Sequence, residues 1–84
     1  MSDPAAAAER IEGFVRETFE VSATDPRFGR DVDLFEGGYV DSVGLTELLA
    51  FIEAEFAVSV PDEDLASDEF MTIGGMATIV GRLS

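Results

Sequence analysis

The stretch Val40–Phe56, VDSVGLTELLAFIEAEF, decides the fold of this chain. Apolar residues recur along it at three- and four-residue steps, which predicts a helix with one core-facing stripe. Asp41 and Ser42 both stand at the position where a side chain caps such a helix. The residues of the stripe are Leu45, Leu48, Leu49, Ile52 and Phe56.

Ser42 is the residue of this stretch with the greatest functional interest. It follows a long Gly-rich loop and begins the helix, which predicts that other proteins can reach it. The chain contains no histidine and no lysine that would make it a nucleophile. Helix capping, worth about 1 kcal/mol, is the plain alternative. The preceding Asp41, the loop and the acidic helix favour a serine that an enzyme modifies and other proteins then handle.

The same reasoning predicts three further helices. Asp3 and Pro4 are a cap and a first helical residue for a helix over 5–19. A short helix follows Pro61 over 62–65, and Thr72 caps a last helix over 73–83. The predicted fold class is therefore all-α, a four-helix bundle of three main helices and one short helix with a long first loop.

The connections between these helices are predicted from turn residues and apolar anchors. Residues 21–41 form the long loop, and Leu34 and Phe35 are expected to pin it over the core. The segment 58–61 reads as an extended link. Gly74 and Gly75 weaken the first turn of the last helix but are expected to allow a close helix contact.

Composition limits the class of protein. With 84 residues, the chain is expected to be one domain over 1–84 and a monomer. No apolar run approaches the roughly 20 residues that span a bilayer. The segment 1–5 lacks the basic and apolar regions of a signal peptide. Because cysteine and histidine are also missing, disulfides and the commonest metal sites are excluded, and we expect a cytoplasmic protein without a metal.

The charge of the chain is strongly negative. Eighteen acids and five arginines give a net charge of −13, and no base lies between Asp31 and Gly81. Nucleic acid and anionic membranes are therefore not expected partners, because phosphate contacts need Lys or Arg. A basic protein surface is the favoured partner, since opposite potentials steer encounter. Simple solubility is the alternative explanation.

Catalytic and metal-binding patterns fit this sequence poorly. A nucleophile elbow needs glycine two residues before the serine, where this chain has Val40. A Ser-His-Asp triad lacks its histidine. Carboxylate pairs such as Asp62 and Asp64 are expected to be solvated, and the segment 31–36 lacks the glycine of a calcium loop. We expect no catalytic residue, and we keep a small hydrolase only as a remote alternative.

The residues 34–42, LFEGGYVDS, followed by Leu45, Glu47 and Leu48, resemble the acyl and peptidyl carrier proteins. The segment 55–61 is similar to that family's link between its second and third helices. The resemblance implies that a phosphopantetheinyl transferase attaches 4′-phosphopantetheine to Ser42, and that the thiol of this arm holds cargo as a thioester. It also implies that Asp41 serves recognition by the transferase.

In this family the second helix is the surface that partner enzymes recognise. The resemblance places Val43, Glu47, Ala50, Glu53 and Ala54 on that surface. The partners that it implies are a transferase, an acyl- or aminoacyl-loading ligase or adenylation enzyme, and an acyltransferase or ketosynthase.

Two departures from fatty-acid carriers favour a more specialised role. Many of those carriers have leucine and an acid where this chain has Val43 and Gly44. We therefore expect a stand-alone carrier for polyketide, macrolactam or nonribosomal-peptide enzymes. The alternatives are a D-alanyl or aminoacyl carrier outside polyketide synthesis and an unmodified acidic adaptor that only binds proteins.

Overall fold

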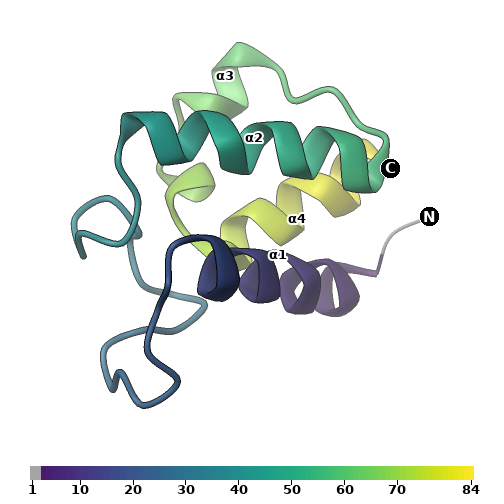
Figure 1. Cartoon of the computed structure of the whole chain (residues 1–84). Coiled ribbons are helices and arrows are strands. Elements are labelled where there is room, and N and C mark those ends of the chain that lie inside the picture. Colours follow the sequence, from purple (N-terminus) through teal and green to yellow (C-terminus); the bar gives the residue numbers. More distant parts are fainter. Residues whose placement is uncertain (1–2) are drawn as a thin grey trace.

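Four α-helices and one short 3₁₀ helix make up the computed structural model, which describes residues 3–84 (Figure 1). The helices are α1 (Pro4–Thr18), α2 (Ser42–Phe56), α3 (Asp62–Leu65), η1 (Asp68–Met71) and α4 (Ile73–Leu83). No strand occurs among these residues, so the predicted all-α class is confirmed. The signal-peptide prediction falls partly on residues 1 and 2, which lie outside the described residues. Sequence reasoning did not find η1.

The first and last helices, α1 and α4, begin where their predicted cap residues stand. Asp3 accepts a hydrogen bond from the N–H of Ala5 at 3.2 Å, with Pro4 in the first helical position. Thr72 Oγ1 accepts one from the N–H of Gly75 at 2.9 Å at the start of α4. These two helices lie side by side and supply most of the core, with the buried residues Ala7, Ala8, Ile11, Val15, Ile73, Met76, Ala77, Ile79 and Val80 (Figure 1).

The predicted close contact at the start of α4 is confirmed. A Cβ atom on Gly75 would overlap the backbone carbonyl oxygen of Glu69 in η1. A Cβ atom on Gly74 would lie 3.3 Å from the carbonyl oxygen of Arg30, which accepts a hydrogen bond from the Gly74 N–H at 2.9 Å. These glycines therefore let η1 and the long loop pack directly against α4.

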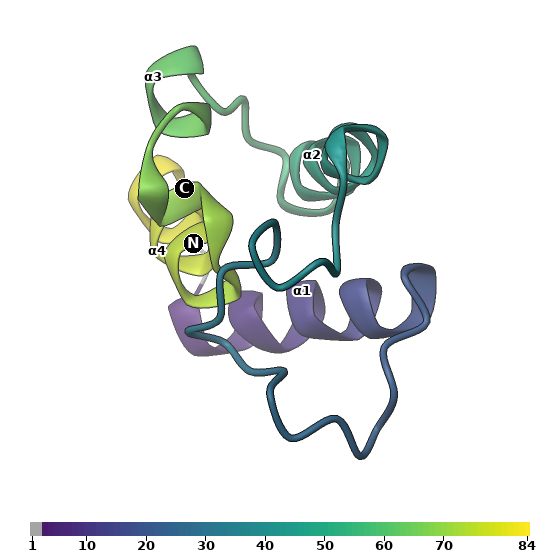
Figure 2. The same ribbon diagram turned by 90° about the vertical axis from the view of Figure 1, so that its left-hand side faces the viewer.

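Helix α2 crosses above α1 and is seen end-on in Figure 2, where α1 lies lengthwise across the view. Only Leu48 and Ile52 of its predicted stripe are buried, whereas Leu45, Leu49 and Phe56 are half-buried. The stripe is thus narrower than the periodicity predicted, because α2 packs at the top of the core and keeps its flanks near solvent.

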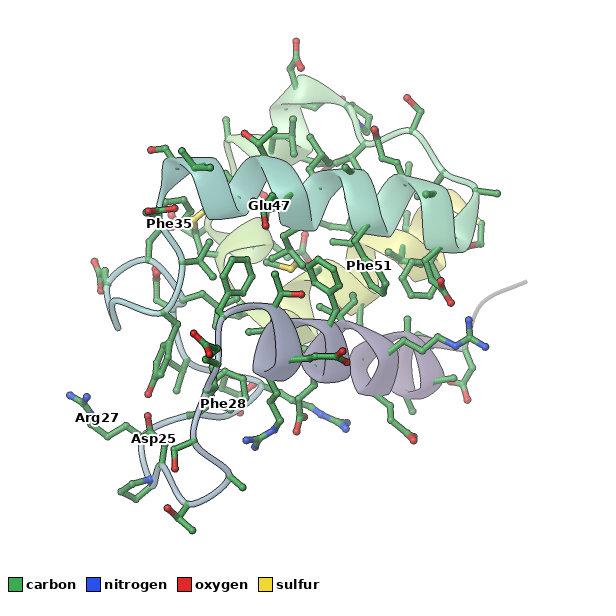
Figure 3. The ribbon with its side chains drawn as sticks, viewed as in Figure 1. Asp25, Arg27, Phe28, Phe35, Glu47 and Phe51 are labelled. Atoms are coloured by element: carbon green, nitrogen blue, oxygen red, sulfur yellow. The ribbon has the colours of Figure 1, made fainter. Side chains whose placement is uncertain are left out.

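An aromatic contact that sequence reasoning missed joins α2 to α1. The rings of Phe51 and Phe14 stack with centroids 4.1 Å apart and an angle of 15° between their planes. Figure 3 shows Phe51 between the two helices. Offset stacking of this kind adds to the stability that burial alone gives.

The long loop between α1 and α2 is held over the core by its own apolar residues. Phe28, Leu34 and Val40 are buried, whereas Phe35 is half-buried at the edge. The prediction is therefore right for Leu34 and wrong for Phe35, whose ring lies where the loop leaves the core for α2. The N–H of Leu34 donates to the Met71 carbonyl at 2.9 Å, which ties the loop to η1.

Candidate modification site at the start of helix α2

Asp41, and not Ser42, caps helix α2. Asp41 Oδ1 accepts a hydrogen bond from the N–H of Gly44 at 2.8 Å, and the Asp41 carbonyl accepts one from the N–H of Leu45 at 2.8 Å. Ser42 is the first helical residue and is exposed, and its hydroxyl makes no hydrogen bond within residues 3–84. The capping explanation for Ser42 therefore falls away, since the neighbouring carboxylate already does that work.

The segment that leads to Ser42 has a fixed conformation. The N–H groups of Tyr39 and Val40 both donate to the Leu34 carbonyl, at 3.0 and 3.1 Å. Gly38 has φ of +80°, a conformation that favours glycine and turns the chain toward α2. Val40 is buried and anchors the turn directly before the cap. The exposed Ser42 thus follows a hydrogen-bonded turn whose last apolar residue, Val40, is buried in the core.

Gly44 is buried in the first turn of α2, beneath an aromatic ring. A Cβ atom there would lie 2.7 Å from Cε1 of Phe19 and 3.2 Å from a methyl carbon of Val40. Phe19 itself packs edge-on against Phe14, with centroids 6.2 Å apart. Packing against Phe19 and Val40 therefore leaves little room for a side chain at position 44.

An open groove of about 470 Å³ lies beside Ser42. We call it the Ser42 groove, and sequence reasoning did not find it. Its aromatic walls come from the end of α1 and from the long loop, and Figure 3 shows Phe35 beside the first turn of α2. The residues that line it are Phe19, Phe35, Gly38, Tyr39, Val40, Asp41 and Ser42.

Four of the five residues predicted to meet partners share one face of α2. Val43, Glu47, Ala50 and Ala54 are all exposed and follow one another at steps of four, three and four residues. Val43 is 69% exposed, more than any other large apolar side chain in the described part of the chain. We call these four residues the outer face of α2.

Glu53 lies apart from the outer face. Its side chain is half-buried, and its Oε2 accepts a hydrogen bond from the N–H of Val60 at 2.9 Å. That bond holds the extended link 58–61 against α2 after the chain has turned at Ala57, which has φ of 53°. Glu53 therefore has a structural partner, the N–H of Val60, that could not be predicted from sequence pattern.

The acidic half of the chain is less uniform in charge than the sequence predicts. Arg10 from α1 pairs with Glu55, and Arg82 from α4 pairs with Asp64 at 2.6 Å and with Glu69 at 3.6 Å. These arginines come from outside the stretch and neutralise part of it. The exposed acids that lie nearest to Ser42 along the sequence are Glu36, Asp41 and Glu47.

The shifted ionisable groups lie on α1 and on the long loop. Hydrogen bonds from Arg30 at 2.9 Å and from Arg16 at 3.0 Å hold the pKa of Glu12 below its usual range. The N–H of Arg27 and the hydroxyl of Tyr39 lower the pKa of Asp25. Loss of water contact, together with the Asp25 carboxylate, raises the pKa of Tyr39. Of these three groups only Tyr39 lines the groove that Ser42 also lines, and its hydroxyl donates a hydrogen bond to Asp25.

Residues 3–84 contain neither a candidate metal site nor a candidate membrane span. No cluster of three or more Asp or Glu side chains there could hold a metal ion. Nor does that part of the chain contain a helix long and apolar enough to cross a membrane.

The comparison with protein families identifies the class of this chain. The family model for the phosphopantetheine attachment site matches residues 9–80. The chain belongs to this family of carrier proteins, as the resemblance predicted, and the family's cofactor is a covalently attached 4′-phosphopantetheine. The exposed hydroxyl of Ser42 and the groove beside it fit such a group.

Known relatives narrow the comparison further. The chain is 43% identical over 42 residues to the D-alanyl carrier protein of Bacillus velezensis. This match covers 50% of this chain and 54% of the relative. It is 37% identical over 43 residues to the D-alanyl carrier protein of Streptococcus pyogenes serotype M1, covering 51% of this chain and 54% of that protein. The chain thus matches about half the length of these relatives. No solved structure matches it.

These relatives support the alternative interpretation better than the main one. Both are named as D-alanyl carriers, and neither points to polyketide, macrolactam or nonribosomal-peptide enzymes. The general prediction of a carrier with a phosphopantetheine arm is confirmed.

Proposed function

We propose that Ser42 carries the 4′-phosphopantetheine and that the chain holds an aminoacyl group on the arm as a thioester. The observation that supports this most is that Asp41, and not Ser42, caps the start of α2. Asp41 satisfies the helix end, which leaves the exposed Ser42 hydroxyl without a structural task. A serine in that state, on a rigid turn, is suited to modification by another enzyme.

The attachment step needs help from the modifying enzyme. The Ser42 oxygen forms a bond to the phosphorus of coenzyme A that carries pantetheine, and the nucleotide portion leaves with the broken P–O bond. The proton of the hydroxyl must go to a base, and the neighbouring Asp41 carboxylate already accepts the N–H of Gly44 as the cap of α2. We propose that a phosphopantetheinyl transferase supplies the base.

Two charges act on the new phosphate in opposite directions. Ser42 begins a 15-residue helix, whose N-terminal end favours an anion. The Asp41 carboxylate opposes an anion beside it. We propose that Asp41 is retained because it caps α2 and because the transferase recognises it. The arm itself supplies the thiol that the chain, which lacks cysteine, does not have.

We further propose that the outer face of α2 is the surface for partner enzymes. Val43 offers an apolar contact next to the attachment residue, and Glu47 offers a negative charge one turn further on. Ala50 and Ala54 leave that face flat enough for a close approach. Glu53 supports it indirectly, by holding the link 58–61 in place. Transferases and loading ligases with basic surfaces suit this face.

The similar proteins favour D-alanine, or another amino acid, as the cargo. Both relatives described above are D-alanyl carriers, and the stretch that they share covers about half of this chain. An adenylating ligase is the partner that such cargo requires. An acyltransferase or ketosynthase would be the partner of the acyl alternative.

The test combines two mass measurements. The purified chain is incubated with a promiscuous transferase and coenzyme A, and its intact mass is recorded. One arm is expected on the wild type and on Ser59→Ala, an exposed serine of the link, and none on Ser42→Ala. The arm-bearing protein is then given ATP with D-alanine and a D-alanine ligase or, in a separate sample, with a carboxylic acid and an acyl-loading ligase. Addition of acyl but not D-alanine would contradict the proposed cargo.

A further inference from the structure

We propose that, between encounters with partner enzymes, the pantetheine arm on Ser42 rests in the Ser42 groove against Phe19, Phe35 and Tyr39. This inference depends on the proposed attachment at Ser42. It concerns where the arm lies, which neither the family match nor the relatives address.

Continuity between the attachment point and the groove is the first argument. Ser42 is itself one of the residues that line the groove, so an arm attached to its hydroxyl begins at the groove. The groove volume of about 470 Å³ falls in the range of small-molecule sites, roughly 300–1,000 Å³. The proposed occupant is the pantetheine arm, which is attached to the chain beside the groove.

The chemistry of the walls is the second argument. Phe19, Phe35 and Tyr39 are each half-buried, so three aromatic rings around one serine keep part of their apolar surface in water. Beyond its phosphate, the arm is uncharged and carries methyl and methylene groups together with amides. Covering the rings with these groups removes apolar surface from water on both sides.

The third argument is that contacts within the chain already hold two of the aromatic rings of the groove in place. The Phe19 ring is held from behind by Phe14, edge to face at 6.2 Å. The Tyr39 ring is held by Phe28 at 5.2 Å, and its hydroxyl donates to Asp25 at 2.8 Å. Two of the three rings therefore need little further ordering when the arm settles, which lowers the entropy that binding costs.

A second groove provides a control location. It has a volume of about 430 Å³ and lies between the start of α1 and the end of α2, where Phe56 and Arg10 line it. Ser42 and Phe56 stand at opposite ends of α2, about 21 Å apart at 1.5 Å per residue. An arm that rests in the Ser42 groove should leave Phe56 untouched.

The experiment is an NMR comparison of the full chain before and after the arm is attached, with the mass of each sample recorded. We expect shift changes at Phe19, Phe35, Gly38 and Tyr39, and nuclear Overhauser effects from the arm's methyl groups to the Phe19 and Tyr39 rings. Phe35→Ala should weaken those effects, because it removes the wall on the edge of the groove. Phe35→Leu and Phe56→Ala should keep them.

Two results would overturn the inference while the attachment stands. In the first, the mass shows the arm, but shift changes stay within residues 41–44, so the arm extends into water. In the second, the methyl groups contact α3 or the link 58–61. A sample whose mass never rises would instead refute attachment at Ser42, and the resting place of the arm with it.

Discussion

The ring of Phe19 fills the space beside Gly44: a Cβ atom on Gly44 would lie 2.7 Å from Cε1 of that ring. The end of α1 and the first turn of α2 are thereby joined directly, two residues after Ser42. Phe19 also forms a wall of the Ser42 groove, so one side chain connects the packing of the helices with the site.

Gly44→Ala should therefore destabilise the fold although alanine is the better helix former. Overpacking of this kind costs typically about 1–3 kcal/mol, against roughly 1 kcal/mol gained in helix propensity. The matched control is Gly13→Ala in α1, where a Cβ atom would meet nothing within 4 Å. It should stabilise the chain by up to about 1 kcal/mol. Urea unfolding measures both, and equal behaviour of the two variants would contradict the Phe19 contact.

Burial along α2 predicts unequal costs for two truncations that sequence periodicity treats alike. Ile52 is fully buried, so Ile52→Ala should cost about 2–5 kcal/mol in the free energy of unfolding. Leu49 is half-buried and should cost clearly less when changed to alanine. The same urea titration measures both variants. A Leu49→Ala variant as unstable as Ile52→Ala would mean that α2 is rotated relative to the core.

Reversal of charge on the outer face of α2 should slow encounter with a partner. Glu47→Arg should weaken binding to the transferase mainly through a lower association rate, and the effect should shrink as salt increases. Glu17→Arg is the matched control, since it makes the same charge change at an exposed position of α1. Surface plasmon resonance at several salt concentrations measures the rates. Equal association rates for both variants at low salt would show that the position of Glu47 has no importance.

The loss of stability on going from neutral to acidic pH should depend in part on Glu12. Its pKa in the folded chain lies below the ordinary value of 4.5, because Arg30 and Arg16 donate hydrogen bonds to its two oxygens. Its contribution is therefore present above pH 4.5 and is lost as the pH falls through the lowered folded pKa. Glu12→Gln should be less stable than wild type at neutral pH, and the difference should narrow in acid.

Glu9→Gln removes a carboxylate at an exposed position of the same helix and is the control for the Glu12 experiment. Its difference from wild type at neutral pH should be the smaller of the two. Thermal unfolding followed by circular dichroism from pH 7 to pH 3 gives these values. A Glu12→Gln difference that stays constant over this range would rule out the ion-pair explanation.

The sequence predicted best the features that depend on near neighbours. The caps at Asp3 and Thr72, the bounds of the three main helices and the exposure of Val43 all follow from residues within one or two turns. The choice between Asp41 and Ser42 as cap stayed open, because both residue types accept hydrogen bonds from a helix end equally well. Only the coordinates assign the cap to Asp41.

Features that join distant parts of the chain could not be predicted in this way. The Ser42 groove needs Phe19 from the end of α1 and Tyr39 from the loop, and periodicity within a helix does not show where either ring lies. The ion pair between Arg10 and Glu55 joins residues 45 positions apart. Sequence reasoning therefore overestimated how much negative charge the acidic stretch leaves without an arginine partner. Glu53 was likewise predicted to meet a partner enzyme, whereas in the structure it binds the N–H of Val60 in the link 58–61.

The most direct test of the central claim is to locate the arm on the chain by mass spectrometry. The protein is treated with a transferase and coenzyme A and then digested, and its peptides are fragmented to identify the modified residue. Phosphopantetheine should be found on Ser42 and on no other serine, in a yield that approaches one arm per chain. An arm on Ser59 or Ser67, or a chain that stays unmodified while a control carrier is fully converted, would contradict the account.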